Sequence, residues 1–261
     1  MSERRVRVAT TRDEAAGGPL AEALARWGME PVRCATIAHV PPLDPGPLER
    51  AARELERYDW LIVASARAVA ALAVARGGRP LPSGLRTAAV GAKTAARLET
   101  HGAVSPLIPR TAGAAALLVA LRAADEWRDR RVLMPRAAEG GREIARALGG
   151  RGAVVDEVVA YRTIERPPDE IASAWRAAAP EAVVVASPSA ARALVRALGT
   201  EPLRRLEPVV AIGSKTAMAL MALGVRAMVP PRADFEAVAA LLARTTGWQA
   251  PGAAVPERRR S

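Results

Sequence analysis

The sequence predicts an α/β protein made of two similar domains, each a five-stranded parallel sheet flanked by helices. Short apolar, β-rich runs alternate with segments of helical periodicity, which is typical of βαβ units. Part of the chain repeats at a constant spacing, and its 261 residues exceed the usual single-domain size of roughly 100–200 residues. These observations together favour two duplicated α/β domains.

The internal repeat aligns segments that lie 122 residues apart without a gap. Ser65 falls on Ser187, since 187 − 65 = 122. A constant spacing held over about 50 residues indicates a duplication rather than a composition bias. A weaker match at a spacing of 124 pairs Arg12 with Arg136, and chance alone can also explain it. The segments matched at 122 are 61–72 with 183–194 and 89–102 with 211–224.

Apolar β-rich runs place ten strands, five for each sheet. The second sheet is complete only if two strands near the N-terminus join three strands from the C-terminal part. One predicted set is 59–64, 86–91, 103–108, 131–135 and 153–159; the other is 181–186, 208–213, 225–229, 4–9 and 31–35.

Proline pairs mark the predicted domain boundaries. Pro41-Pro42 and Pro167-Pro168 interrupt helix or strand at equivalent places in the repeat. They favour one domain inserted in the other, joined by a two-segment hinge, over two contiguous halves cut near 125–130. The predicted parts are an inserted domain at 42–160, a discontinuous domain at 1–35 plus 168–247, and a disordered basic tail at 248–261.

Composition argues against several classes of protein. The net charge of +11 invites a nucleic-acid role, but the arginines are scattered and only 3% of residues are aromatic, so little surface can stack on bases. Apolar runs stay short of the ~18 residues that a membrane span needs. The charged N-terminus lacks a secretory pattern, which predicts a cytoplasmic protein. Cys34, the single cysteine, is expected to be buried and inert.

The duplicated residues fall where a parallel sheet binds ligands. Ligands lie beyond the carboxyl ends of the strands, where helix N-termini present N–H groups and partial positive charge. The alternative is structural, because a serine there is often only a helix cap and a glycine only a turn. Four such turns facing one cleft would suit a small ligand with several negative groups. They carry Ser65, Gly91, Lys93 and Thr94 in one copy, and Ser187, Gly213, Lys215 and Thr216 in the other.

Three further residues are candidates for the same cleft. Arg12 and Arg136 close strand-like runs and can pair with carboxylates, although a solvated surface arginine fits equally well. Tyr161 lies at a predicted domain crossing, where a phenol can act as a proton donor. A tyrosine that only packs is the alternative.

Absent motifs restrict the chemistry. His39 and His101 are the only histidines and have no partner at metal-ligand spacing, so no metal site is expected. The sequence lacks GxxxxGK[ST], a strand-associated GxGxxG, and GxSxG. No cofactor is therefore predicted.

On these residues, the chain resembles the uroporphyrinogen-III synthase family. The resemblance runs from Val6 to about Thr246 and rests on short motifs in a fixed order. Those motifs are VATTR ending at Arg12, LIVASARAV, VVVASPSAA, the paired AVGAKTA and AIGSKTA, and VVAYRT around Tyr161.

The resemblance implies an activity and roles for matching residues. The family cyclises hydroxymethylbilane with inversion of ring D through a spiro intermediate, giving uroporphyrinogen III and water, a cofactor-free lyase step of tetrapyrrole and heme biosynthesis. By resemblance, Tyr161 assists departure of the hydroxyl, and Ser65, Thr94, Ser187 and Thr216 contact the substrate. A monomer that receives its substrate from hydroxymethylbilane synthase is expected, without nucleic-acid or membrane partners.

The two copies differ at one turn. Ala66-Arg67 stands where the other copy has Pro188-Ser189, so Arg67 is expected to make a contact that its copy cannot. Ser189 is a further candidate for substrate binding. A different class of function stays open beside the synthase. It is a non-catalytic two-domain protein that closes on an anionic metabolite as a binder or sensor.

Overall fold

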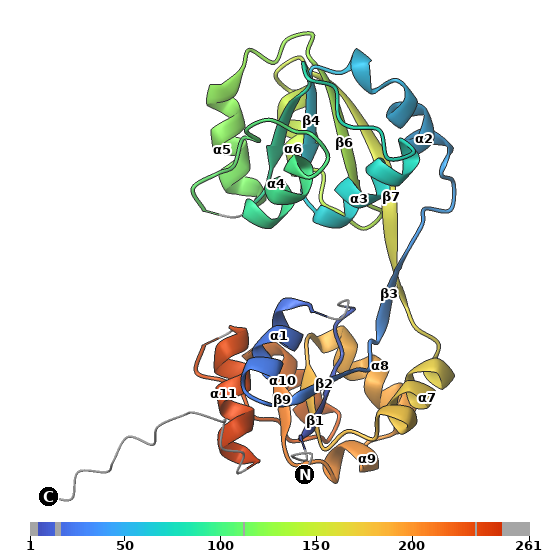
Figure 1. Ribbon diagram of the computed structural model, residues 1–261, viewed down its shortest axis with the longest axis vertical. Helices are drawn as coiled ribbons and strands as arrows, with labels where there is room; N and C mark the ends of the chain where they lie inside the picture. The colour runs from blue at the N-terminus through green and yellow to red at the C-terminus, as the bar shows by residue number, and fades with distance from the viewer. Residues whose placement is uncertain (1–4, 14–16, 112, 233, 247–261) are drawn as a thin grey trace, which may run out of the picture. The chain divides into compact units, whose positions relative to one another are not determined.

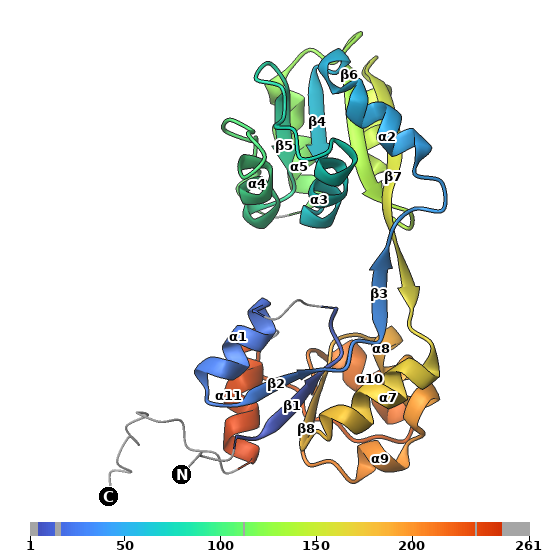
Figure 2. The ribbon, with the colours of Figure 1, turned by 45° about the vertical axis from the view of Figure 1, so that its right-hand side comes forward.

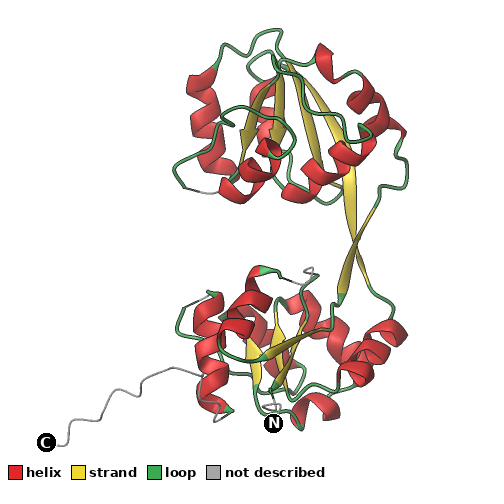
Figure 3. Ribbon diagram, in the orientation of Figure 1, coloured by secondary structure: helices red, strands yellow, loops and turns green. Residues whose placement is uncertain are grey.

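The computed structural model describes residues 5–13, 17–111, 113–232 and 234–246. Contacts divide the chain into two compact units, each a sheet with helices on both faces (Figure 1 and Figure 3). Unit 1 comprises Met1–Ala38 and Ile164–Ser261, and unit 2 comprises His39–Thr163. The predicted basic tail, 248–261, lies outside the described residues. The predicted domain bounds, 42–160 and 1–35 plus 168–247, stay a prediction.

Unit 1 contains a four-stranded parallel sheet in the order β2-β1-β8-β9. Its strands come from both ends of the chain, since β1 and β2 precede unit 2 and β8 and β9 follow it. The elements are β1 (Arg7–Thr10), α1 (Pro19–Arg26), β2 (Glu30–Arg33), α7 (Pro168–Ala178), β8 (Ala182–Val185), α8 (Pro188–Leu198), α9 (Glu201–Arg204), β9 (Val209–Ala211), α10 (Ser214–Ala222) and α11 (Phe235–Thr245).

Alternate residues of the unit 1 strands pack into two hydrophobic cores, one on each face of the sheet, because successive side chains of a strand point to opposite faces. Val183 and Val185 face α7, α8 and α10, whereas Ala182 and Val184 face α1 and α11. All four are fully buried. The unbroken apolar run of β8 is thus the signature of a central strand covered on both faces.

Unit 2 repeats this arrangement in four strands, in the order β7-β6-β4-β5. Leu61 and Val63 of β4 pack with α2, α3 and α4, and Trp60 and Ile62 pack with α5 and α6. The elements are α2 (Gly46–Arg53), a 3-10 turn (Leu55–Arg57), β4 (Trp60–Val63), α3 (Ala66–Ala75), β5 (Arg86–Ala89), α4 (Ala92–Glu99), α5 (Ala114–Ala124), β6 (Arg131–Ala137), α6 (Glu143–Gly149) and β7 (Val154–Glu165).

The two strand orders match under the spacings found in the sequence. A spacing of 122 carries β4 and β5 onto β8 and β9, and a spacing of 124 carries β1 and β2 onto β6 and β7. The predicted parallel α/β class is therefore confirmed. The weaker match that pairs Arg12 with Arg136 also follows the order of the strands.

The edge strands predicted at 103–108 and 225–229 are much shorter than expected. Each is reduced to an isolated bridge, Leu107 with Ala88 and Met228 with Val210. Prolines limit both, because Pro106 and Pro109 flank Leu107, and Pro230 and Pro231 close the other segment. A proline supplies no N–H to a ladder and is tolerated only at such edges.

Two strands near the unit boundary differ from those placed in the sequence. β3 (Ile37–Val40) pairs with β7, and β7 continues to Glu165, well past the predicted end at 159 (Figure 2). Both strands cross the boundary between the units. The two crossing segments are therefore hydrogen-bonded neighbours rather than independent linkers.

Cys34 lies in the core of unit 1. It is fully buried, and its backbone N–H donates to the carbonyl of Thr10 at 3.0 Å. Burial raises the pKa of its thiol to about 11, since desolvation disfavours the thiolate. This agrees with the prediction of a buried cysteine.

Each unit also contains a carboxylate that receives an indole N–H. In unit 2, Asp125 accepts from Trp60 at 2.9 Å and forms ion pairs with Arg86 and Arg130. In unit 1, Glu236 accepts from Trp27 at 3.1 Å and pairs with Arg26. The Asp125 side chain is 9% exposed and that of Glu236 is 52% exposed, so of these two carboxylates only Asp125 is shielded from water.

Within the described residues, no helix is both long and apolar enough to cross a membrane.

Candidate functional site

The predicted site residues cluster at one edge of each sheet. Ser65 follows β4 and Gly91 follows β5, while Ser187 follows β8 and Gly213 follows β9. Because neighbouring parallel strands end at the same edge, each pair of turns shares the carboxyl edge of its own sheet. Each of these four residues is the N-cap of the helix that comes next.

Ser65 joins the first turn of α3 to a tyrosine. Its Oγ accepts the backbone N–H of Arg67 at 3.1 Å, which caps the helix. The same Oγ accepts the hydroxyl of Tyr161 at 3.1 Å, across 96 residues of sequence. The structure therefore brings together two residues that the sequence predicted separately.

Tyr161 reaches Ser65 because of the strand order. It lies on β7, and β6 separates β7 from β4. Its neighbour on β6 is Ala137, at a register shift that follows Arg136. The neighbouring side chain is a single methyl group, and the Tyr161 ring packs partly buried against the core of unit 2.

Two residues that the sequence did not single out for this site contact or support Tyr161. The ring of His39 meets the Tyr161 ring edge-on, with centroids 5.5 Å apart and planes at 82°. Thr163 Oγ1 lies 3.2 Å from His39 Nδ1. No local motif could have shown this, because the contacts depend on the pairing of β3 with β7.

The Ser187 turn is built differently. Ser187 Oγ accepts the backbone N–H of Ala190 at 3.1 Å and shares a 2.9 Å hydrogen bond with Ser189 Oγ. Thr11, which is 1% exposed, accepts the backbone N–H of Ala186 on its Oγ1 at 2.9 Å. This turn is therefore fixed by hydroxyls from its own loop and from the end of β1.

The glycine turns agree in conformation in both copies. Gly91 and Gly213 have extended backbones, with φ of −178° and −155°. Lys93 and Lys215 are exposed at the helix starts. Thr94 and Thr216 are 6% and 4% exposed, so their side chains pack into the protein. The lysines are thus better placed than the threonines to offer a side chain to a soluble anion.

The three candidate arginines have distinct surroundings. The guanidinium of Arg12 lies 5.2 Å from the centroid of the Phe235 ring. Arg136 Nη1 donates to the carbonyls of Ala137 and Ala138, at 2.9 and 3.0 Å, and Nε forms an ion pair with Glu157. The Arg67 side chain is exposed. Because Nη1 of Arg136 donates within its own loop and Nε pairs with Glu157, this geometry fits loop support, and the substrate contact stays a prediction.

Among the described residues, no group of three or more His, Cys, Asp and Glu side chains is arranged to hold a metal ion.

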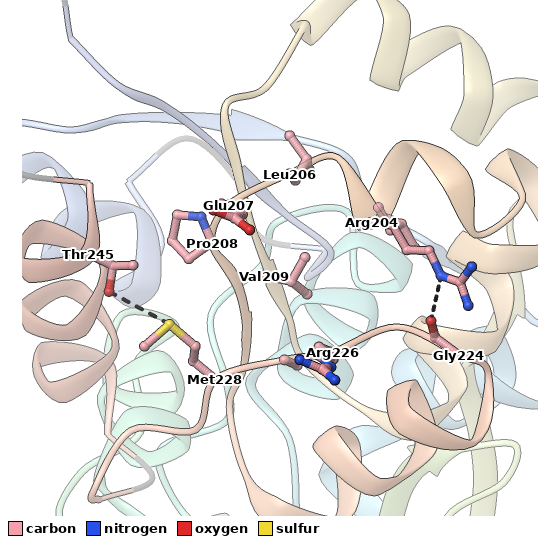
Figure 4. A pocket seen from close by; sticks show the side chains of 11 residues that line it. Arg204, Leu206, Glu207, Pro208, Val209, Gly224, Arg226, Met228 and Thr245 are labelled. Atoms are coloured by element: carbon pink, nitrogen blue, oxygen red, sulfur yellow. Dashed lines mark hydrogen bonds between the residues drawn. The ribbon is translucent and has the colours of Figure 1, made fainter.

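A hollow of unit 1 lies away from these turns. It measures about 580 Å³ and lies at the amino-terminal edge of the sheet, where Glu207 and Pro208 lead into β9 (Figure 4). Arg204 Nε donates to the Gly224 carbonyl at 2.7 Å beside it. None of the predicted site residues lines it. Gly213 follows β9 at its other end, so this hollow and the candidate site are separate.

Comparison with known proteins gives two matches of sequence. A family model described as "Uroporphyrinogen-III synthase HemD" matches residues 18–240. A curated uroporphyrinogen-III synthase from Synechococcus elongatus is 34% identical over 179 residues, which cover 66% of each chain. The aligned part thus spans about two thirds of that relative's length.

Several solved structures are similar in fold, including two with TM-scores above 0.5. A mutant uroporphyrinogen III synthase from the extremely thermophilic bacterium Thermus thermophilus aligns with a TM-score of 0.54 at 19% identity, covering 94% of this chain and 100% of that one. The synthase from Helicobacter pylori aligns with a TM-score of 0.55 at 17% identity, covering 93% and 100%. At these identities the likeness shows a shared fold.

Proposed function

The chain belongs to the uroporphyrinogen-III synthase family, and we propose that it converts hydroxymethylbilane into uroporphyrinogen III. The reaction releases water, closes the macrocycle and inverts ring D through a spiro intermediate, which makes the protein a lyase. No cofactor enters this scheme. The observation that carries the proposal is the hydrogen bond from the Tyr161 hydroxyl to Ser65, at the edge where parallel sheets bind ligands.

Substrate binding is assigned to the turns of both units. Carboxylates are stabilised at helix N-termini by N–H groups and by the partial charge of the helix dipole. Lys93 and Lys215 add full positive charges at two of these helix starts. The extended glycines before them leave room for a carboxylate to approach the backbone closely. Arg67 and Ser189 lie in the remaining two turns.

Tyr161 is assigned to the departure of the hydroxyl group. A neutral phenol can donate a proton as the C–O bond breaks, an effect that typically contributes about 10²–10⁴-fold. Holding the reactive ends together contributes more, since near-attack geometry lowers barriers by roughly 7–11 kcal/mol. Catalysis therefore rests mainly on positioning, with Tyr161 as a secondary contributor.

The test is the isomer of the product. Hydroxymethylbilane is generated in situ with and without the protein, the products are oxidised, and the uroporphyrin isomers are separated by chromatography. Spontaneous closure gives isomer I, and we expect a protein-dependent switch to isomer III. If folded protein yields only isomer I, the synthase proposal is wrong. The same result is what a non-catalytic anion binder would give, and no contact described above favours that alternative.

A monomeric state, a cytoplasmic location and transfer of substrate from hydroxymethylbilane synthase stay predictions.

A further inference from the structure

We propose that Ser65 is a second catalytic residue, which passes its own hydroxyl proton to the departing group and is reprotonated by Tyr161. This inference rests on the proposed synthase function and deepens it. It makes the tyrosine the remote end of a two-proton relay rather than the group in contact with the leaving oxygen.

The hydrogen bonds of Ser65 carry the argument. A serine hydroxyl has one hydrogen to donate and two lone pairs that accept. The Arg67 N–H and the Tyr161 hydroxyl, each at 3.1 Å, occupy both lone pairs. The hydrogen of Ser65 is then the group left for a ligand at this turn. The Tyr161 hydrogen, in contrast, is already committed to Ser65.

The surroundings of Ser65 favour a proton donor. As its proton leaves, negative charge develops on Oγ at the N-terminus of α3, a ten-residue helix. The partial positive charge of the helix and the Arg67 N–H stabilise that charge. The Tyr161 hydroxyl lowers the charge further by delivering its own proton.

The phenol is held in place for this transfer. The ring of Tyr161 packs against the core of unit 2 on one side and meets the edge of the His39 ring on another. Thr163 in turn contacts His39 Nδ1. A fixed ring keeps the hydroxyl aimed at Ser65, which a relay requires at each turnover.

The step balances without another reagent. The C–O bond breaks, its electron pair stays with the oxygen, and the Ser65 proton converts that oxygen to water. The phenol proton moves to Ser65 Oγ and leaves a phenolate. The phenolate regains a proton when the cyclising substrate releases one later in the same turnover, since the net reaction is the loss of one water.

Variants of Ser65 separate proton transfer from helix capping. Asparagine is as good an N-cap as serine, is neutral and can donate a hydrogen bond, but it does not relay a proton. Threonine keeps the cap and the hydroxyl. We expect Ser65→Asn to lower the single-turnover rate constant about 10²-fold with little change in KM. We expect Ser65→Thr to stay within about threefold of the wild type.

A proton inventory supplies the second readout. Single-turnover rate constants are measured with enzyme in excess in mixtures of H₂O and D₂O, so that product release does not mask the chemistry. For the wild type, the relay predicts that a plot of the rate constant against the fraction of D₂O is bowed, because two protons move together. For Tyr161→Phe it predicts a linear plot. If Ser65 had only a structural role, the rate constant of the wild type would depend linearly on the fraction of D₂O.

The outcomes distinguish the two proposals. If the wild type forms isomer III, with a linear inventory and a Ser65→Asn rate equal to wild type, the relay is wrong and the synthase function stands. If the wild type forms no isomer III, both are wrong. A bowed inventory together with a slow Ser65→Asn and a fast Ser65→Thr supports the relay.

Discussion

The Ser65 turn of unit 2 and the Ser187 turn of unit 1 are copies of one element that now have different partners. Both serines follow a buried strand and cap the next helix through a backbone N–H at 3.1 Å. Only Ser65 accepts a phenol, whereas Ser187 shares its hydrogen bond with Ser189 of its own loop. At the spacing of 161 − 37 = 124, Ile37 corresponds to Tyr161. The duplication thus preserved the cap, while in one copy only the serine also accepts a hydroxyl from β7, two strands away in the sheet.

Of the changes that test this comparison, removing the Tyr161 hydroxyl should have the largest effect on activity. We expect Tyr161→Phe to lower kcat about 10²-fold without abolishing turnover, because general-acid assistance is lost while positioning remains. The measurement is isomer III formation at saturating substrate. Tyr58→Phe is the matched control, since Tyr58 donates to Asp156 at 2.7 Å and precedes β4, at the opposite edge of the sheet. Complete loss of activity in a folded Tyr161→Phe protein would show that positioning alone explains less than we infer.

The two carboxylates that accept an indole N–H, Asp125 and Glu236, should contribute different amounts to the stability of the protein. We expect Asp125→Ala to cost about 2–3 kcal/mol, because the indole N–H of Trp60 and the guanidinium groups of Arg86 and Arg130 lose a shielded acceptor. We expect Glu236→Ala to cost below about 1 kcal/mol, because its side chain is exposed. Urea unfolding followed by circular dichroism measures both. Equal losses would mean that burial does not distinguish the two carboxylates.

Lowering the pH should show the contribution of Asp125 to the stability of the wild type. Burial raises the pKa of Asp125, but the Trp60 hydrogen bond and the charges of Arg86 and Arg130 outweigh it, so the net pKa is lowered. A lowered folded pKa gives stability that is present above the unfolded value, about 3.9, and is lost as pH falls through the folded pKa. Unfolding free energies at about pH 6 and about pH 3 should therefore differ less in Asp125→Ala than in the wild type.

Truncating the two cap serines should give equal stability losses. Ser65→Ala and Ser187→Ala should each cost about 1 kcal/mol, the usual value of an N-cap. Thermal unfolding measures this, and a clearly larger loss for Ser65→Ala would show that the Tyr161 hydrogen bond also stabilises unit 2.

The lysine pair should give the smallest effect. We expect Lys93→Ala and Lys215→Ala each to raise KM about three- to tenfold, because each removes one partly screened charge from a helix start. The double variant should show additive free energies, since the two lysines belong to different units. If only one lysine changes KM, then only one unit binds the substrate carboxylates.

Much of the fold could be predicted because it is encoded locally or by repetition. The buried runs of β4 and β8 and the spacing of 122 residues led to two parallel sheets, which the structure has. The residues 103–108 and 225–229 form only bridges, because a β-rich composition does not outweigh the prolines beside them. The pairing of β3 with β7 depends on contacts between distant segments and left no periodic signal.

The site was predictable residue by residue but not as a network. Ser65 and Tyr161 are each suggested by position, yet their hydrogen bond depends on β6 lying between β4 and β7 and on the small Ala137. Arg136 shows the converse, since its position at the end of a strand suggested a ligand contact, while its Nη1 donates to nearby carbonyls. Side-chain partners of this kind follow from tertiary register, which one sequence does not reveal.

The single thiol of the chain gives unit 1 a marker of its own. Cys34 is fully buried, and its pKa of about 11 keeps it protonated near neutral pH. Thiol reagents attack the thiolate, so labelling requires the core of unit 1 to open. Because unit 2 contains no cysteine, the labelling rate in increasing denaturant reports the opening of one copy alone. A duplicated molecule thereby allows its two halves to be followed separately, one by alkylation and both by circular dichroism.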